Sequence, residues 1–178
     1  SAAGRLSRAD VLELNAIDAE KYVPFVVGHF EATNRHINAS DVKMIYDLFN
    51  GHTFYIQKIF NESFADTREG EVCTLDTIRT AINNIIASND TIFREILSNI
   101  PEKQKELLYA IAKDGKAEQI TSAEFIKRHR LTSASSVQSA TKKLLEKDII
   151  TERNKIYSLN DKLFAMWINK LYGNTTML

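Results

Sequence analysis

Five polar side chains recur at helical spacing within one short stretch of this sequence. They are Ser135, Gln138, Ser139, Lys142 and Lys143. Residues three or four positions apart share one face of a helix, so these side chains would point the same way. Serine hydroxyls are short, a glutamine amide can pair with an adenine edge, and lysines neutralise phosphates, which suits a surface that binds nucleic acid. The same composition also suits an ordinary solvated face, and the face alone does not decide between the two.

The expected helix has an apolar stripe on its other side that would pack into a core. The stripe consists of Val137, Ala140, Leu144 and Leu145. Ser133, or Thr132 before it, can accept a hydrogen bond from a free backbone N–H group and so begin the helix.

Two helices come before this stretch and a hairpin follows it. The sequence predicts a helix from Glu102 that ends at Gly115, and a short helix capped by Thr121 or Ser122. The hairpin spans residues 148–159 and turns at 153–155, and Asn160 is expected to cap a last helix.

This order of helix, short helix, turn, helix and hairpin is that of a winged helix-turn-helix. In that fold the third helix can enter a DNA groove and the hairpin can touch the backbone. Arg153 and Lys155 at the hairpin turn are therefore expected to lie on phosphates.

The first hundred residues favour an all-helical bundle. Helices are expected over about 20–34, from a cap at Ser40 to Asn50-Gly51, and over 54–64, with a loop at 34–38. A long helical stretch from Thr74 or Asp76 bends near Asn89 and ends at Pro101. The predicted fold class is mainly α, a helical bundle followed by a winged helix with a small β-hairpin and a C-terminal helix.

The charge is divided unevenly although the 178 residues sum to +0. Residues 1–100 hold 9 Lys and Arg against 14 Asp and Glu, and residues 101–178 hold 14 against 9. This split suggests two modules, of which the basic one is the better partner for nucleic acid, although the halves could also attract each other. One cysteine, Cys73, fits a reducing cytoplasm, and no apolar run suggests a membrane span.

Motifs that carry catalysis are missing from this sequence. The six glycines do not have the spacing of a Walker A loop or a dinucleotide fingerprint. One cysteine and four scattered histidines do not supply a zinc site, so no metal and no catalytic residue is predicted.

Several segments resemble a known family. A helix that ends Phe49-Asn50-Gly51 and continues His52-Thr53-Phe54-Tyr55-Ile56-Gln57 resembles the helical lid behind the nucleotide-binding core of archaeal-type AAA+/STAND-like ATPases, which are also common in Bacteroidetes. Their lid is followed by a winged helix. Residues 102–115, Ser133-Ala-Ser-Ser-Val-Gln138 and the Asp161…Phe164-x-x-Trp167 ending are similar to that part, so the resemblance covers about residues 10–172.

The resemblance implies a piece of a larger ATPase. Residues 1–100 would be the lid, with 1–17 a remnant of the upstream core, and residues 101–178 would be the winged-helix domain. The Gly51, His52 and Thr53 loop would lie on the adenine side of the nucleotide. This chain would need no cofactor of its own and would not act as an enzyme, whereas the parent would use ATP and Mg²⁺ in a core that contacts the lid.

Three functional hypotheses follow. In the first, the winged helix binds double-stranded DNA through Ser135, Gln138, Ser139, Lys142, Lys143, Arg153 and Lys155. In the second, it is an intramolecular or protein–protein interaction module that regulates the ATPase switch. In the third, the chain is a free-standing transcription regulator with a helical dimerisation domain. All three are expected in the cytoplasm.

Overall fold

The computed structural model describes residues 18–174. The chain forms two compact units, which divide between Ile85 and Ile86. The sequence predicts a domain boundary later, at residue 100, and that boundary stays a prediction. The expected core remnant at residues 1–17 lies outside the described residues.

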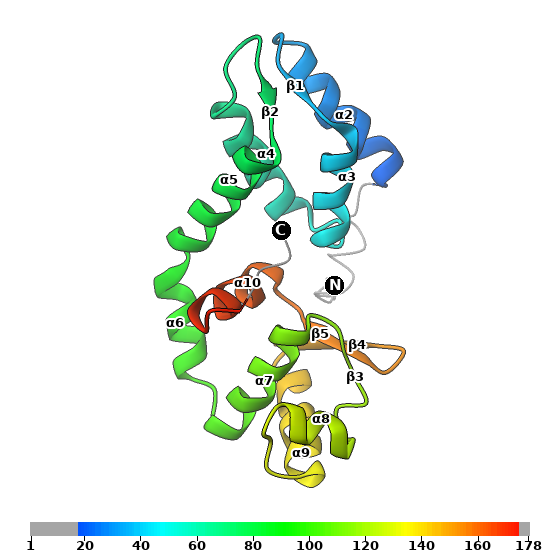
Figure 1. Ribbon diagram of the computed structural model, residues 1–178, viewed down its shortest axis with the longest axis vertical. Coiled ribbons are helices and arrows are strands. Elements are labelled where there is room, and N and C mark those ends of the chain that lie inside the picture. The colour runs from blue at the N-terminus through cyan, green and yellow to red at the C-terminus, as the bar shows by residue number, and fades with distance from the viewer. Residues whose placement is uncertain (1–17, 175–178) are drawn as a thin grey trace, which may run out of the picture. The chain divides into compact units, whose positions relative to one another are not determined.

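The first unit is built from α2 (Ala19–Glu31), α3 (Ala39–Leu48), α4 (Thr53–Ala65) and most of α5 (Leu75–Ser88) (Figure 1). Apolar residues at helical spacing turn inward from each of these helices, as the sequence predicts. The fully buried ones include Phe30, Val42, Ile45, Ile56, Ile59, Ile78 and Ile85.

The bundle also holds a small strand pair that the sequence does not predict. In place of a loop over 34–38, β1 (His36–Ile37) pairs in parallel with β2 (Val72–Cys73). The guanidinium of Arg35 fixes the approach to this pair, because its Nε donates to the Thr67 carbonyl at 2.6 Å and its charge lies 4.5 Å from the centre of the Phe64 ring.

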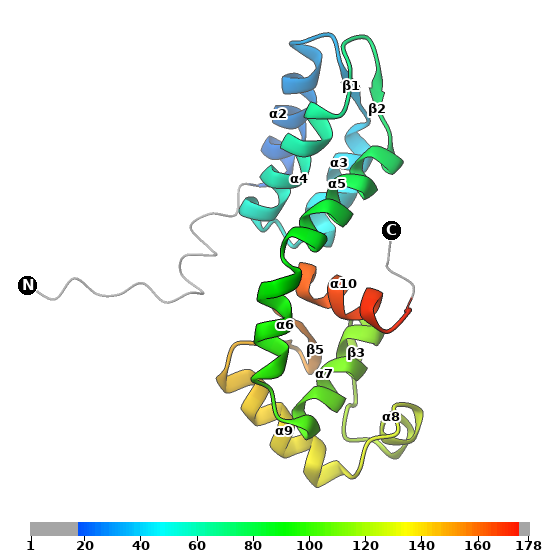
Figure 2. The same ribbon diagram turned by 90° about the vertical axis from the view of Figure 1, so that its left-hand side faces the viewer.

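The second unit contains α6 (Asp90–Ser98), α7 (Glu102–Asp114), α8 (Ala123–Arg128), α9 (Ala134–Glu146) and α10 (Lys162–Leu171). Its antiparallel sheet has the order β3-β5-β4, from β3 (Ala117–Glu118), β4 (Ile150–Arg153) and β5 (Ile156–Leu159). Figure 2 shows α9 beside α7, and α7 also contacts β3 and β5 of the sheet. The predicted fold class is confirmed, although the sequence pattern missed β3.

Some of the predicted helix starts need correction. The helix after the first loop begins at Ala39, with Asn38 at the N-cap position, so Ser40 lies inside α3 and does not cap it. The last helix is capped by Asp161 and not Asn160, since an Asp161 carboxylate oxygen accepts from the Phe164 N–H group at 3.1 Å. The caps at Ser122 and Ser133 are confirmed.

An aromatic and ionic cluster fastens α6 to α10. The indole N–H of Trp167 donates to one Asp90 oxygen at 2.8 Å, and Arg94 donates to the other at 2.8 Å. Phe93 packs on the rings of both Phe164 and Trp167. The hydrogen bonds from Arg94 and then from Trp167 lower the pKa of Asp90 from its usual 3.8.

This cluster predicts a specific acid sensitivity. Because the folded pKa of Asp90 is depressed, its carboxylate stabilises the fold above the unfolded pKa, and that contribution is lost as the pH falls through the folded pKa. Asp90→Asn should therefore lower stability at pH 7 and weaken the loss of stability below the usual pKa of 3.8. Thermal unfolding followed by the fluorescence of Trp167, the only tryptophan, measures both effects.

Asp66→Asn is the matched control, since it removes one exposed carboxylate at the end of α4 in the other unit. Equal acid sensitivity of the Asp90→Asn and Asp66→Asn variants would contradict the assignment.

Candidate nucleic-acid interface

The predicted recognition helix is α9, and its inner face is firmly packed. Val137, Ala140 and Leu144 are buried as predicted, and Leu145 is half-buried. Thr141 is buried as well, and its hydroxyl is satisfied by donating to the Val137 carbonyl at 2.7 Å. The packing against α7 therefore fixes which face of α9 meets solvent.

The outer face of α9 carries all the side chains that the sequence singled out there. Exposed residues on this helix include Ser135, Gln138, Ser139, Lys142 and Lys143. They form one continuous stripe along about 12 Å of helix, at the usual rise per residue. The stripe passes from hydroxyls and an amide at the N-terminal end to cations at the C-terminal end.

The start of α9 is held by local side-chain hydrogen bonds. The Ser133 hydroxyl accepts from the Ser136 N–H group at 3.2 Å and lies 3.1 Å from the Ser135 hydroxyl. Thr132 does not cap the helix, because its hydroxyl oxygen accepts instead from the Lys103 ammonium on α7 at 2.8 Å. The turn before α9 is thus tied to the first helix of the domain.

An acid stands at the far end of the stripe. Glu146 pairs with Lys143 at 2.9 Å, and both side chains are about half exposed. This hydrogen bond, together with the charges of Lys143 and Lys142, lowers the pKa of Glu146. An exposed pair of this kind is weak, so Lys143 can exchange its partner for a phosphate at little cost.

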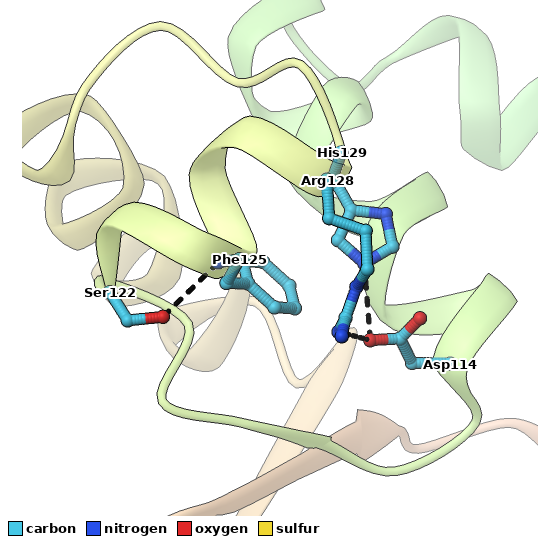
Figure 3. A network of polar contacts seen from close by, with 5 residues as sticks. All are labelled: Asp114, Ser122, Phe125, Arg128 and His129. Atoms are coloured by element: carbon cyan, nitrogen blue, oxygen red, sulfur yellow. Dashed lines mark hydrogen bonds and ion pairs between the residues drawn. The ribbon is translucent and has the colours of Figure 1, made fainter.

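A polar network holds α8 against the end of α7 (Figure 3). The Asp114 carboxylate accepts from the Arg128 guanidinium at 2.5 Å and lies 3.1 Å from Nε2 of His129. Phe125 packs beside Arg128 and His129, on the side away from Asp114, with the His129 ring 4.5 Å away and the Arg128 charge 5.6 Å from its centre. Ser122 caps the same helix by accepting from the Phe125 N–H group at 3.1 Å. This network ties α8 to the C-terminal end of α7.

The wing is the hairpin of β4 and β5, which extends away from the helices in Figure 1. Its two-residue turn is Asn154-Lys155, where φ is 52° and 63°. Positive φ at both positions is the geometry of a type I′ turn, which matches the twist of the paired strands. Arg153 and Lys155 are exposed, and the Glu152 carboxylate accepts from the Lys155 N–H group at 2.8 Å.

Two cations beside this surface were missed by the sequence reasoning. Lys127 and Arg130 are exposed near the turn between α8 and α9, and Arg130 has a φ of 55°. The sequence does show a run of basic residues, Lys127-Arg128-His129-Arg130. The sequence alone does not show which of them pair with an acid inside the domain and which remain exposed. Arg128 and His129 both contact Asp114, whereas Lys127 and Arg130 are exposed and have no ion pair within residues 18–174.

The predicted loop at Gly51, His52 and Thr53 lies in the first unit, where Gly51 and His52 connect α3 to α4 and Thr53 is the first residue of α4. The His52 ring stacks on Tyr55 with 4.9 Å between ring centres, and Thr53 donates to the Gly51 carbonyl at 3.4 Å. Within the described residues, Nδ1 of His52 is a buried side-chain nitrogen without a hydrogen-bond partner. The nucleotide role of this loop stays a prediction.

Gly51 has a conformational requirement that can be measured. Its φ is +68°, and a Cβ built on it would lie 2.8 Å from the Tyr46 hydroxyl. Gly51→Ala should lower the free energy of unfolding of the first unit by about 1–2 kcal/mol for the left-handed backbone, and by more because Tyr46 must shift. Urea denaturation followed by far-UV circular dichroism measures this.

Gly70→Ala is the control for backbone strain alone. Gly70 has a φ of +83°, but a Cβ there would meet open space. If Gly51→Ala and Gly70→Ala lower the free energy of unfolding equally, the close approach to Tyr46 adds nothing to the cost of the Gly51 substitution.

Comparison with known proteins identifies the second unit. Residues 91–170 match the profile of a family described as "Probable winged helix domain". The second unit is a winged-helix domain. Among curated proteins, none matches this chain.

A Walker-type ATPase of Pyrococcus abyssi has a similar structure, with a TM-score of 0.60 at 13% sequence identity. The similarity covers 86% of this chain and 42% of that one, so this chain spans less than half the length of that ATPase. At this identity the likeness establishes a shared fold. It extends beyond the winged-helix domain and includes helices of the first unit, since the domain profile alone covers only residues 91–170.

From residue 18 to 174, no group of three or more His, Cys, Asp and Glu side chains could hold a metal ion. Over the same range, no helix has the length and apolar character needed to cross a bilayer.

Proposed function

We propose that the winged-helix domain of this chain binds duplex DNA with α9 in the major groove and the wing on the backbone. The supporting observation is the α9 stripe, in which every side chain that the sequence singled out is exposed on one face. A groove about 12 Å wide admits a helix, and small hydroxyls near the start of α9 allow a close approach. Lys142 and Lys143 would neutralise phosphates on one side, and Arg153 and Lys155 would do so at the wing.

We further propose that this domain works as part of an ATP-dependent protein in the cytoplasm. The shared fold with a Walker-type ATPase supports this, together with the lid-like first unit that precedes the winged helix. The chain has no Walker A sequence, so it would not hydrolyse ATP by itself. Nucleotide bound to the parent core would reposition the lid, and the lid would move the winged helix.

The loop at Gly51, His52 and Thr53 is our candidate for the contact between lid and adenine. The unpartnered Nδ1 of His52 supports it, since an adenine edge offers both a donor and acceptors to a ring nitrogen. The stacking of His52 on Tyr55 fixes the ring plane in advance.

Salt-dependent binding tests the DNA proposal. A labelled random duplex of about 20 base pairs is titrated with the full chain, and fluorescence anisotropy is measured at about 50 mM and about 200 mM salt. Four phosphate contacts predict a slope of log K against log salt near −3.6, which corresponds to roughly a 100-fold loss of affinity over that range.

The competing hypothesis is that the same face binds protein and regulates the ATPase switch. The acids Glu146 and Glu152 beside the basic residues would suit a partner of mixed charge. Absence of binding at about 50 mM salt would overturn the DNA proposal and leave the interaction module in its place.

A further inference from the structure

We infer that Gln138 is the residue that reads sequence, and that the duplex recognised by this chain carries an adenine opposite it in the major groove. This inference rests on the proposed DNA binding and concerns how the same surface discriminates between duplexes. It assigns selectivity to one side chain and general attraction to the lysines.

The position of Gln138 on α9 carries the argument. Ser135 lies one turn before it and Ser139 follows it, so short hydroxyls flank the amide on the N-terminal half of the exposed face. The Ser135 hydroxyl is already within 3.1 Å of the Ser133 hydroxyl. Gln138 is therefore the side chain that reaches furthest from this part of the helix.

The Gln138 amide is also free to bind. Between residues 18 and 174, no intramolecular hydrogen bond, ion pair or ring contact engages this side chain, and it is exposed. By contrast, the hydroxyl of Thr141 and the hydroxyl of the capping residue Ser133 are already hydrogen-bonded to backbone groups of α9. The amide can thus form hydrogen bonds to a ligand without losing internal ones.

The chemistry of the amide selects adenine. Its carbonyl accepts from the adenine N6 amino group while its NH₂ group donates to N7, which gives two parallel hydrogen bonds. Guanine presents two acceptors at the same edge, so the amide carbonyl would face an oxygen. Duplex RNA is a poor substitute, because its major groove is too narrow and deep for side chains to read.

The lysines cannot supply this selectivity. Lys142 lies one turn after Gln138, and Lys143 is already paired with Glu146 at 2.9 Å. A contact to phosphate is the same for every sequence, so these two residues fix affinity and register. Only the N-terminal half of the stripe offers neutral groups that can distinguish base edges.

Selection from a random duplex library tests the inference. The full chain, Gln138→Ala and Lys142→Ala are each used to enrich bound duplexes, and the selected sequences are compared. We expect the full chain to enrich sites with a fixed adenine, and Gln138→Ala to lose the preference at that position alone. Lys142→Ala should keep the preference and bind all duplexes more weakly with a shallower salt slope.

A modified base then identifies the atoms. Replacing the fixed adenine by 7-deazaadenine removes the N7 acceptor, and affinity should fall about tenfold for the full chain but not for Gln138→Ala. An enriched site whose adenine survives in Gln138→Ala overturns the inference, as does salt-dependent binding without any enriched site, and both leave the proposed function standing. Failure to bind any duplex overturns the inference and the proposed function together.

Discussion

Reversing the charge of Lys142 and Lys143 together is expected to lower the affinity for duplex DNA by roughly 100-fold or more at about 50 mM salt. Each lysine that releases one counterion contributes about 15-fold at that salt concentration, and the new carboxylates add repulsion. The salt slope should also become shallower by about 1.8. Anisotropy titrations of Lys142→Glu/Lys143→Glu at several salt concentrations measure both quantities.

A control with the same change in net charge separates the surface from the total charge. Lys113 on α7 and Lys170 on α10 are exposed and lie outside the α9 stripe and the wing. Lys113→Glu/Lys170→Glu should therefore bind DNA nearly as well as the unmodified chain. If the two double variants lose DNA affinity to a similar extent, the DNA does not bind at the α9 stripe.

Replacing Trp167 by alanine is expected to lower the free energy of unfolding of the winged-helix unit by about 3–5 kcal/mol. Trp167 is 4% exposed and packs on Phe93 and Phe164, so truncation leaves a cavity between α6 and α10. It also leaves Asp90 without its indole donor. Urea unfolding followed by far-UV circular dichroism measures the loss, because the variant has no tryptophan fluorescence.

Trp167→Phe isolates the hydrogen bond from the packing. It keeps an aromatic ring beside Phe93 and removes only the N–H donor and part of the ring, so the expected loss is about 1–2 kcal/mol. If Trp167→Phe lowers the free energy of unfolding as much as Trp167→Ala does, the hydrogen bond to Asp90 accounts for the stabilisation by Trp167 and the buried ring does not.

The sequence predicted those features that depend on one element at a time. The inner and outer faces of α9 follow from helical spacing, so Val137 and Gln138 could be assigned to opposite sides without knowing the neighbours. The caps at Ser122 and Ser133 follow from hydroxyls directly before apolar runs. The wing turn follows from Asn154-Lys155 between two β-rich segments.

Features that depend on two distant elements could not be predicted in this way. β1 and β3 each contain two residues, too few to show an alternating pattern, and exist because a partner strand lies beside them. Asp114 and His129 have no pattern in the sequence that pairs them, and they come into contact only because α7 and α8 pack together. The cap at Asp161 was missed because Asn160 beside it is an equally good capping residue.

For the α9 stripe, the helical spacing in the sequence predicts which side chains are exposed but not what they bind. Exposure of its five residues follows from the buried positions between them, and the structure agrees with that geometry. Whether the exposed face meets DNA depends on its partner, which no spacing encodes. The Lys143 contact with Glu146 shows the same limit, since a residue expected on phosphate already has an internal anion.

The parallel pairing of β1 with β2 has a consequence for synthesis on the ribosome. His36 donates its N–H group to the Glu71 carbonyl at 3.0 Å, and Ile37 is paired with Cys73. A nascent chain that has not yet released its segment around residue 73 cannot close this pair, although α2 and α3 have already emerged. We therefore expect the first unit to stay partly folded, with Ile37 exposed to solvent, until the segment that contains β2 has left the exit tunnel.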